Sequence, residues 1–259
     1  MTLTPSRSLA LAGQTVLVIG GSAGVGLEVA RQVRAEGGDV ILTARGRERL
    51  VDAAKEIEPV STATFDATDL DAVENFFREL SAPVDHVIVT AGGSYYAPLA
   101  EIDFAAARSI FEEKLWLAIT VAQQAAQGKV RDGGSILFTS GTAPRRPAVG
   151  VSIPAASVGA MTAITRNLAL ELAPVRFNLI AAGFLDTPLS ASLLGAGIDA
   201  RREQLRQELP IRRVVEVSEV AALAVHIMTN GALTGAAYDI DGGESLLPAV
   251  EGKHPDDYR

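Results

Sequence analysis

Four glycines stand within a segment of seven residues, Gly20-Gly21-Ser22-Ala23-Gly24-Val25-Gly26. A β-branched run at residues 15–19 precedes the segment, and a helical pattern at residues 25–36 follows it. Glycine permits a tight turn, and the N-terminus of the following helix presents free N–H groups and a partial positive charge to an anion. The segment therefore predicts a turn that binds a pyrophosphate. The expected contacts are Gly20, Ser22, Ala23, Gly24, Val25 and Gly26.

Two arginines follow the next expected strand, residues 39–43. When such a turn binds NAD, an acidic residue about 20 positions further on bonds the ribose 2′-hydroxyl. Here that position carries Arg45, with Arg47 close by and no carboxylate between them. An arginine pairs with a 2′-phosphate, which an acidic residue would repel. The pattern favours NADP(H) over NAD(H), and the alternative is two solvated arginines at the start of a helix.

Short apolar runs alternate with helical patterns along the sequence. Strands are expected at residues 15–19, 39–43, 62–65, 86–90, 135–139, 176–181 and 237–240. Helices are expected at residues 25–36, 47–56, 70–80, 104–127, 154–172 and 218–228. Strands separated by helices form right-handed βαβ units and a parallel sheet. We therefore expect an α/β fold of the Rossmann type, a doubly wound parallel sheet with helices on both faces, in a single domain of residues 1–259.

Three finer features are predicted from local sequence. The turn Asp132-Gly133-Gly134 is expected to precede the fifth strand, and Ser218 is expected to cap the last helix. Residues 183–213 are expected to be irregular, with one polar helix, and to form a substrate lid. On an exposed face of that helix we expect arginines paired locally with Glu203 and Glu208, namely Arg201, Arg202 and Arg206.

The composition excludes several classes of protein. The chain has no cysteine, so it forms no disulfide and no thiolate metal site, and its histidines show no ligand spacing. A net charge of −8 argues against a nucleic-acid partner. The uncharged run 147–165 approaches the length of a membrane span, but it contains Pro147, Pro154 and several serines and threonines, which favours the core of the fold. The first 12 residues lack the apolar run of a signal peptide. We expect a cytoplasmic protein with no metal and no membrane segment.

Further motifs occur in a fixed order after the glycine turn. They are Phe65-Asp66-Ala67, Thr90-Ala91-Gly92, Gly134-Ser135-Ile136-Leu137-Phe138-Thr139-Ser140, Ala182-Gly183-Phe184-Leu185-Asp186-Thr187, Thr234-Gly235 and Asp241-Gly242-Gly243. Together with the glycine turn, they resemble the short-chain dehydrogenase/reductase family over nearly the whole chain. The resemblance implies further cofactor contacts at the ends of later strands. These are Asp66 at the adenine, Ala67, Ala91, Gly92, Gly183, and Thr187 at the nicotinamide carboxamide.

The catalytic residues of that family are a serine, a tyrosine and a lysine, with an asparagine on a helix. In the family, the serine binds the reacting oxygen and the tyrosine donates the proton. The lysine lowers the pKa of the tyrosine and holds the nicotinamide ribose. Ser140 matches the serine, whereas Ile153 and Ser157 stand at the tyrosine and lysine positions, and Lys114 stands at the asparagine position. The resemblance therefore implies a cofactor site, with Ser157 among its contacts, but no standard proton donor.

Three features are candidates to replace the missing groups. Tyr95 and Tyr96 follow the fourth strand, where a phenol can act as a general acid or can simply line the pocket. Lys114, if buried beside the nicotinamide, would have a lowered pKa and act as the acid; alternatively its stem packs on the helix and its head is solvated. Arg145 and Arg146 would bind an anionic group of the substrate, but a solvated pair is what we expect of this loop.

Two functions fit these observations. The first is an NADP(H)-dependent oxidoreductase acting on a small carbonyl or alcohol, in which Ser140 binds the oxygen and the proton comes from a tyrosine, Lys114 or water. The second is a catalytically silent protein that senses NADP(H) or partners an active relative. The family resemblance also implies a homodimer or homotetramer packed through helix 154–172. Small residues on that helix would allow the close approach: Ala155, Ala156, Gly159, Ala160 and Ala163.

Overall fold

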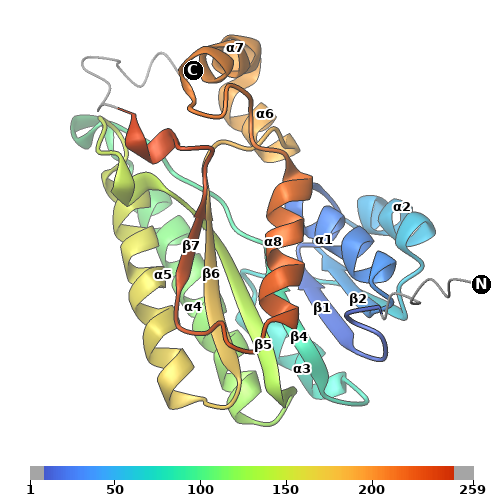
Figure 1. The fold of residues 1–259 in the computed structure, drawn as a ribbon. Coiled ribbons are helices and arrows are strands. Elements are labelled where there is room, and N and C mark those ends of the chain that lie inside the picture. Colours follow the sequence, from blue (N-terminus) through green and yellow to red (C-terminus); the bar gives the residue numbers. More distant parts are fainter. Residues whose placement is uncertain (1–8, 248–259) are drawn as a thin grey trace, which may run out of the picture.

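The computed structural model describes residues 9–247, and the strands of this part form one sheet (Figure 1). The ends of the predicted domain of residues 1–259 lie outside the described residues. The strand order is β3-β2-β1-β4-β5-β6-β7, and every neighbouring pair is parallel. The bounds are β1 Thr15–Ile19, β2 Asp39–Ala44, β3 Ser61–Thr64, β4 Val84–Val89, β5 Val130–Gly141, β6 Arg176–Ala182 and β7 Ala237–Ile240.

Helices cover both faces of the sheet. One face packs against α1 (Gly24–Ala35), α2 (Arg47–Ile57) and α8 (Val217–Thr229), and the other against α3 (Leu70–Glu79), α4 (Phe104–Ala126) and α5 (Ser152–Glu171). Both faces are apolar because side chains alternate along each strand and both sets are buried. In β1, Val16 and Val18 face the first layer, and Leu17 and Ile19 face the second. The predicted Rossmann-type fold is confirmed. Within residues 9–247, no helix has the length and apolar character needed to cross a membrane.

All the strands end at the same edge of the sheet, and the predicted lid lies beyond that edge. The order of the strands reverses between β1 and β4, which is where ligands bind in open sheets of this kind. α6 (Pro188–Leu194) and α7 (Ile198–Glu208) lie above the strand ends (Figure 1). The segment 183–213 thus contains two α-helices, with a 3-10 turn between them, where one helix was predicted. Leu205 anchors α7 because its side chain is completely buried.

Two local predictions are wrong. Asp132-Gly133-Gly134 is not a turn before β5 but part of it. Val84 of β4 pairs with Val130, whereas His86 pairs with Ser135, so the extra residues of β5 bulge out of register. The last helix is capped by Glu216 rather than Ser218, because the side chains of Glu216 and Glu219 bond reciprocally to the backbone in a capping box.

Toward the amino ends of the central strands, buried polar side chains satisfy one another. His86 contacts Ser135 Oγ through Nδ1 at 2.8 Å and Gln14 Oε1 through Nε2 at 2.7 Å. Because an amide oxygen only accepts, Nε2 carries the hydrogen and Nδ1 accepts from the Ser135 hydroxyl. Burial, and to a smaller extent the charge of Arg176, lowers the pKa of His86 to about 4. The ring is therefore neutral at neutral pH.

Candidate functional site

The glycine turn lies between the carboxyl end of β1 and the start of α1, beside the end of β4. Gly26 is required there, since a Cβ would lie 2.3 Å from the Gly20 carbonyl oxygen and 2.6 Å from Thr90 Oγ1. The Thr90 hydroxyl donates to the same carbonyl at 3.0 Å and holds the turn against β4. α1 begins after Ala23 without a side-chain cap, so its first N–H groups face outward without a side-chain acceptor. This arrangement fits a pyrophosphate.

The turn also faces the segment that follows β6. Gly24 has a left-handed φ of +54°, and a Cβ there would lie 3.6 Å from Thr187 Cγ2. Thr187 caps α6 by accepting from the Ser190 N–H. Gly183 packs so closely on Asp241 that a Cβ would lie 2.8 Å from the Asp241 Cβ. The structure therefore brings the predicted pyrophosphate contacts beside a predicted nicotinamide contact, although the two segments are far apart in the sequence.

Arg45 and Asp66 meet where β2 and β3 end. The Arg45 guanidinium lies 3.6 Å from the Asp66 carboxylate, and 75% of the Arg45 side chain is exposed. The Thr68 N–H and hydroxyl both donate to Asp66 Oδ1 at 3.0 Å. Chiefly because of the Thr68 N–H, with Arg45 a smaller cause, the pKa of Asp66 is lowered. Arg47, two residues after Arg45, is the first residue of α2 and is exposed. Ala67, next to Asp66, packs against the core.

Two buried hydroxyls in the predicted catalytic region have no hydrogen-bond partner among the described residues: Ser140 Oγ and Ser157 Oγ. Ser140 is the next-to-last residue of β5 and pairs with Ala181 of β6. Ser157 lies in the second turn of α5 and is 6% exposed. A buried hydroxyl left without a partner costs about 1–3 kcal/mol. α5 contains no tyrosine and no lysine, and Ile153 in its first turn is half-buried.

Lys114 extends from the middle of α4 across the chain that follows β4. A Cβ at Gly92 would lie 3.2 Å from Lys114 Cε and 3.5 Å from Lys114 Cγ, so the lysine stem lies against Gly92. Burial lowers the pKa of Lys114, and the described residues give its ammonium no hydrogen bond or ion pair. Lys114 therefore lies between the two alternatives for this residue, because its stem is packed but the side chain as a whole is only partly buried.

The two tyrosines after β4 lie elsewhere. The Tyr95 hydroxyl accepts from the Asp103 N–H at 2.6 Å, at the N-terminus of α4. Asp103 precedes Lys114 by eleven residues, which is roughly 16 Å along a helix. The Tyr96 side chain is 53% exposed. The Tyr95 phenol therefore has a structural contact of its own, away from the Lys114 backbone, whereas the Tyr96 side chain is mostly in contact with solvent.

The arginines of the β5–α5 loop and of the lid form ion pairs. Arg145 pairs with Asp239 at 2.6 Å, and Arg146 lies 3.8 Å from Glu244. The expectation of a solvated loop pair is thus wrong, because both side chains are largely covered. Arg201 of α7 bonds Glu244 instead of a glutamate of its own helix, whereas Arg206 pairs locally with Glu203 as predicted. Arg202 pairs with Asp186 and Asp199. Glu244 also accepts from the Phe184 N–H at 3.2 Å, so it ties the lid to the strand ends.

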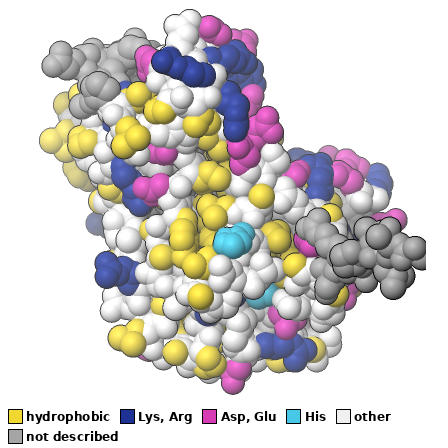
Figure 2. All heavy atoms as spheres, viewed as in Figure 1, with side chains coloured by type: hydrophobic (Ala, Val, Ile, Leu, Met, Phe, Trp, Pro, Cys, Tyr) yellow, Lys and Arg dark blue, Asp and Glu magenta, His cyan; other side chains and the backbone are white. Residues whose placement is uncertain are grey.

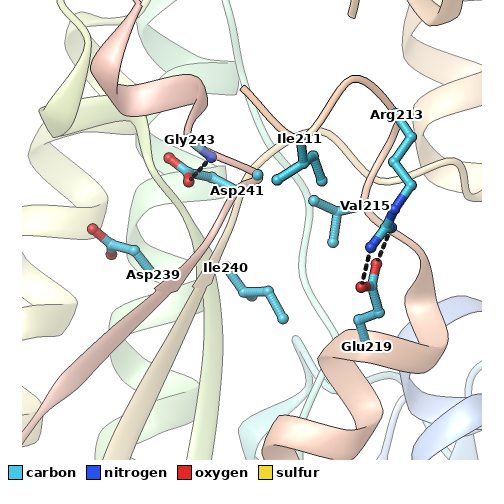
Figure 3. Close-up of a pocket in the computed structure, with 9 residues that line it drawn as sticks. Ile211, Arg213, Val215, Glu219, Asp239, Ile240, Asp241 and Gly243 are labelled. Carbon is cyan, nitrogen blue, oxygen red and sulfur yellow. Dashed lines mark hydrogen bonds and ion pairs between the residues drawn. The ribbon is translucent and has the colours of Figure 1, made fainter. Parts of the chain in front are cut away.

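A cavity of about 360 Å³ lies between β7, the start of α8 and the chain that returns from the lid (Figure 3). The Arg213 guanidinium and the Glu219 carboxylate, both on its wall, face one another and bond at 2.6 and 2.7 Å. The Asp241 carboxylate accepts from the N–H groups of Gly243 and Ser245, each at 2.8 Å. None of the predicted site residues lines this cavity, so it is not the candidate site. Within residues 9–247, no group of three or more acidic or histidine side chains is placed to hold a metal ion.

The parallel sheet, its switch point between β1 and β4 and the glycine turn at that point define a Rossmann-type nucleotide-binding fold. A family model described as enoyl-(acyl carrier protein) reductase matches residues 20–245. The chain is 30% identical, over 251 residues, to the short-chain dehydrogenase/reductase ATR9 of Stachybotrys chlorohalonatus, with 90% of this chain and 98% of the relative covered. The chain belongs to the short-chain dehydrogenase/reductase family of oxidoreductases.

Two further similarities bear on the chemistry. L-xylulose reductase of Mus musculus is 28% identical, and the match covers 91% of this chain and 98% of the relative. A crystal structure of a short-chain dehydrogenase from Burkholderia cenocepacia, in complex with NADP, superposes with a TM-score of 0.82. That protein is 27% identical, and the match covers 92% of this chain and all of the other. A reductase and an NADP-bound dehydrogenase are therefore among the proteins that this chain resembles.

Two structural residues of the site were not predicted. Thr90 was part of a recognised motif, but its hydroxyl contact with the Gly20 carbonyl joins residues 70 positions apart. Glu244 follows the Asp241-Gly242-Gly243 motif and binds residues of the lid and the β5–α5 loop. The sequence shows that Glu244 directly follows the motif, but its partners are distant in the sequence and become known only from the fold.

Proposed function

We propose that this protein is an NADP(H)-dependent oxidoreductase that interconverts a small carbonyl compound and its alcohol, at a site without the tyrosine and lysine of its family. The observation that carries the proposal is the pair of buried, unpartnered hydroxyls of Ser140 and Ser157. Buried polar groups that serve structure alone are normally hydrogen-bonded. Two buried hydroxyls without partners, one on β5 and one on the neighbouring α5, support a site whose bound cofactor and substrate would supply the missing hydrogen bonds.

The residues present fit NADP(H). The turn from Gly20 to Gly26 would hold the pyrophosphate, and Asp66 with Ala67 would hold the adenine. Arg45 and Arg47 would pair with the 2′-phosphate. The nicotinamide half would lie against the ends of β4 and β6 and the start of α5, at Ala91, Gly92, Gly183, Thr187 and Ser157. When bound, the reduced cofactor supplies hydride. NADP in the Burkholderia cenocepacia relative supports this choice of cofactor.

Ser140 would hold the reacting oxygen. Its hydroxyl is at the carboxyl end of a central strand and is not engaged by the described protein atoms. It can therefore donate a hydrogen bond to a carbonyl oxygen without first breaking another. A donor already in place at the position where charge develops lowers the barrier, and because it is held by β5 it needs no reorganisation.

A binding and turnover experiment tests the proposal. NADPH and NADH are titrated by fluorescence, and a panel of aldehydes and ketones is then screened for NADPH consumption. We expect NADPH to bind more tightly than NADH and at least one carbonyl to be reduced. Tight NADPH binding with no turnover on the whole panel would instead favour the catalytically silent protein, and failure to bind either cofactor would reject both functions.

We also propose that the protein works as a homodimer or homotetramer. Large apolar side chains are exposed on the two adjacent helices of one face, with Phe104 and Trp116 on α4 and Leu170 on α5 exposed by 80%, 56% and 83%. Figure 2 shows further hydrophobic side chains gathered over the region of β7 and α8 on the viewed face. Such surfaces are typical of closed symmetric assemblies. Light scattering at micromolar concentration checks the assembly, and a cytoplasmic location stays a prediction.

A further inference from the structure

We propose that Lys114 is the proton donor of this site and that it enters from α4, in place of the tyrosine that α5 lacks. The inference rests on the proposed function, because it assigns the acid for that reaction. The assignment requires that Lys114, Ser140 and Ser157 lie on the same face of the sheet. It also requires that the Tyr95 phenol lies away from this site and that the Lys114 ammonium has no other role.

The three side chains share one face. Ile136 and Phe138 of β5 pack in the layer of α3, α4 and α5, whereas Leu137 packs in the opposite layer. Because side chains alternate along a strand, Ser140 points to the same side as Phe138, toward α4 and α5. These two helices pack against each other, and they carry Lys114 and Ser157.

Lys114 and Ser140 are also at the same level of the sheet. β4 ends at Val89, which pairs with Phe138, two residues before Ser140. The chain continues from Val89 to Gly92, and the Lys114 stem lies against Gly92 with Cε nearest. The ammonium therefore extends past the end of β4, the strand beside Ser140.

The ammonium has no other role among the described residues. The neighbouring acids on α4 are already engaged, because Glu112 pairs with Arg108 and Glu113 accepts from Ser109. The ionised groups of α5, Arg166 and Glu171, lie in its later turns, away from Ser157. The loop arginines Arg145 and Arg146 pair with Asp239 and Glu244. No described carboxylate thus neutralises Lys114, and its burial without one makes the loss of a proton easier.

The step balances as follows in the direction of reduction. The carbonyl carbon gains a hydride from the reduced cofactor, and the electron pair of the C=O π bond moves to the oxygen. That oxygen, held by Ser140, takes one proton from the Lys114 ammonium and becomes the alcohol. Lys114 is left as a neutral amine and regains its proton from solvent. Oxidation of an alcohol runs the same step backward, with the neutral amine as the base.

Two variants of Lys114 test whether the side chain acts by releasing a proton rather than through its positive charge or its size. Lys114→Met keeps the length of the stem, and Lys114→Arg keeps the positive charge on a group that does not release a proton. We expect both to bind NADPH about as well as the parent protein and to lose roughly 100-fold or more in kcat. Lys129→Met is the matched control. This lysine follows α4, its Nζ donates to the Arg78 carbonyl, and its loss should leave kcat unchanged.

A second readout does not depend on turnover. The Lys114 side-chain NMR signal, assigned by its loss in Lys114→Met, is followed against pH with and without NADP⁺. We expect it to titrate below the usual range of a lysine side chain and to shift when NADP⁺ is added. A signal that titrates in the usual range and ignores NADP⁺ would overturn the proposal, as would an active parent protein whose Lys114→Met variant is equally active. A parent protein that reduces no carbonyl would reject the proposed function itself, and this role of Lys114 with it.

Discussion

Ser135 and Ser140 stand on the same strand, five residues apart, and their hydroxyls have opposite surroundings. Ser135 is completely buried and donates to His86, which is held in turn by Gln14. Ser140 Oγ is also buried, but no described atom bonds to it. The first hydroxyl belongs to a closed network that stabilises the sheet. The second leaves a hydrogen bond unmade, at a cost in stability that a purely structural residue would not carry.

The two ends of the central strands therefore differ in what their polar side chains do. The His86 ring and the Ser135 hydroxyl find their partners inside the protein, although Nε of the neighbouring Arg176 has none, so a change at His86 or Ser135 should alter the free energy of unfolding. At the carboxyl edge, the hydroxyls of Ser140 and Ser157 are buried without partners among the described residues, and the partly buried Lys114 has no partner among them either. A change there should alter binding or turnover and leave folding nearly untouched.

The largest expected effect is that of Ser140→Ala on turnover. Loss of a positioned donor to the reacting oxygen should lower kcat by roughly 100-fold or more. The urea midpoint should stay the same or rise slightly, because the variant removes a hydroxyl that lacks a partner. Steady-state kinetics and urea unfolding measure the two effects.

Ser135→Ala is the matched control, since it makes the same change on the same strand. It leaves His86 Nδ1 buried without a donor, so unfolding should become easier by about 1–3 kcal/mol while kcat is unchanged. If Ser140→Ala destabilised the protein as much as Ser135→Ala and spared turnover, the functional distinction between the two hydroxyls would be lost.

Acid should destabilise the protein through His86. Its folded-state pKa, about 4, lies below its unfolded value, about 6.5, so the unfolded chain takes up a proton first as the pH falls. The native state is therefore most favoured above pH ~6.5, and the contribution of His86 is lost as the pH falls toward ~4. At about pH 5 the loss is about 2 kcal/mol, measured by urea unfolding against pH.

His86→Gln identifies the group responsible. Glutamine keeps a polar side chain but does not titrate, so the loss of stability between neutral pH and pH ~5 should be smaller in the variant than in the parent protein. The same dependence on pH in both proteins would assign acid sensitivity to other groups.

The smallest expected effect concerns the cofactor's 2′-phosphate. Arg45→Ala should raise the Kd for NADPH about tenfold and leave that for NADH unchanged, a modest effect because the side chain is mostly exposed. Fluorescence titration measures both constants. Arg34→Ala is the control, because Arg34 lies at the end of α1 beside the start of β2, away from the carboxyl edge. An equal loss of affinity for both cofactors would remove Arg45 from the discrimination between them.

Most of the fold could be predicted because its signals are local. Apolar runs and helical patterns placed the strands and helices to within a few residues, and β1 and β7 have the predicted bounds. The errors arose where a distant or competing partner decides the structure. The bulge at Asp132-Gly133-Gly134 depends on the register with β4, and the cap at Glu216 depends on a reciprocal bond with Glu219.

The site was predictable as a set of positions but not as a set of contacts. The motif residues lie at the strand ends, since a parallel sheet brings all those ends to one edge, and their roles stay predictions. The sequence left Tyr95, Tyr96 and Lys114 as candidates for the proton donor. Only the fold shows the Tyr95 hydroxyl bonded at the start of α4 and the Lys114 stem against Gly92. The unpartnered state of Ser140 and Ser157 likewise depends on every group packed around them.

Transfer of hydrogen from cofactor to substrate is the most direct measurement of whether this carboxyl edge is a redox site. The parent protein is incubated with a panel of aldehydes and ketones and NADPH that carries deuterium at both C4 positions, and the products are analysed by mass spectrometry. We expect an alcohol with one deuterium on the former carbonyl carbon, and far less of it from Ser140→Ala. Deuterium in no product, from a protein that binds NADPH tightly, would contradict the proposed oxidoreductase.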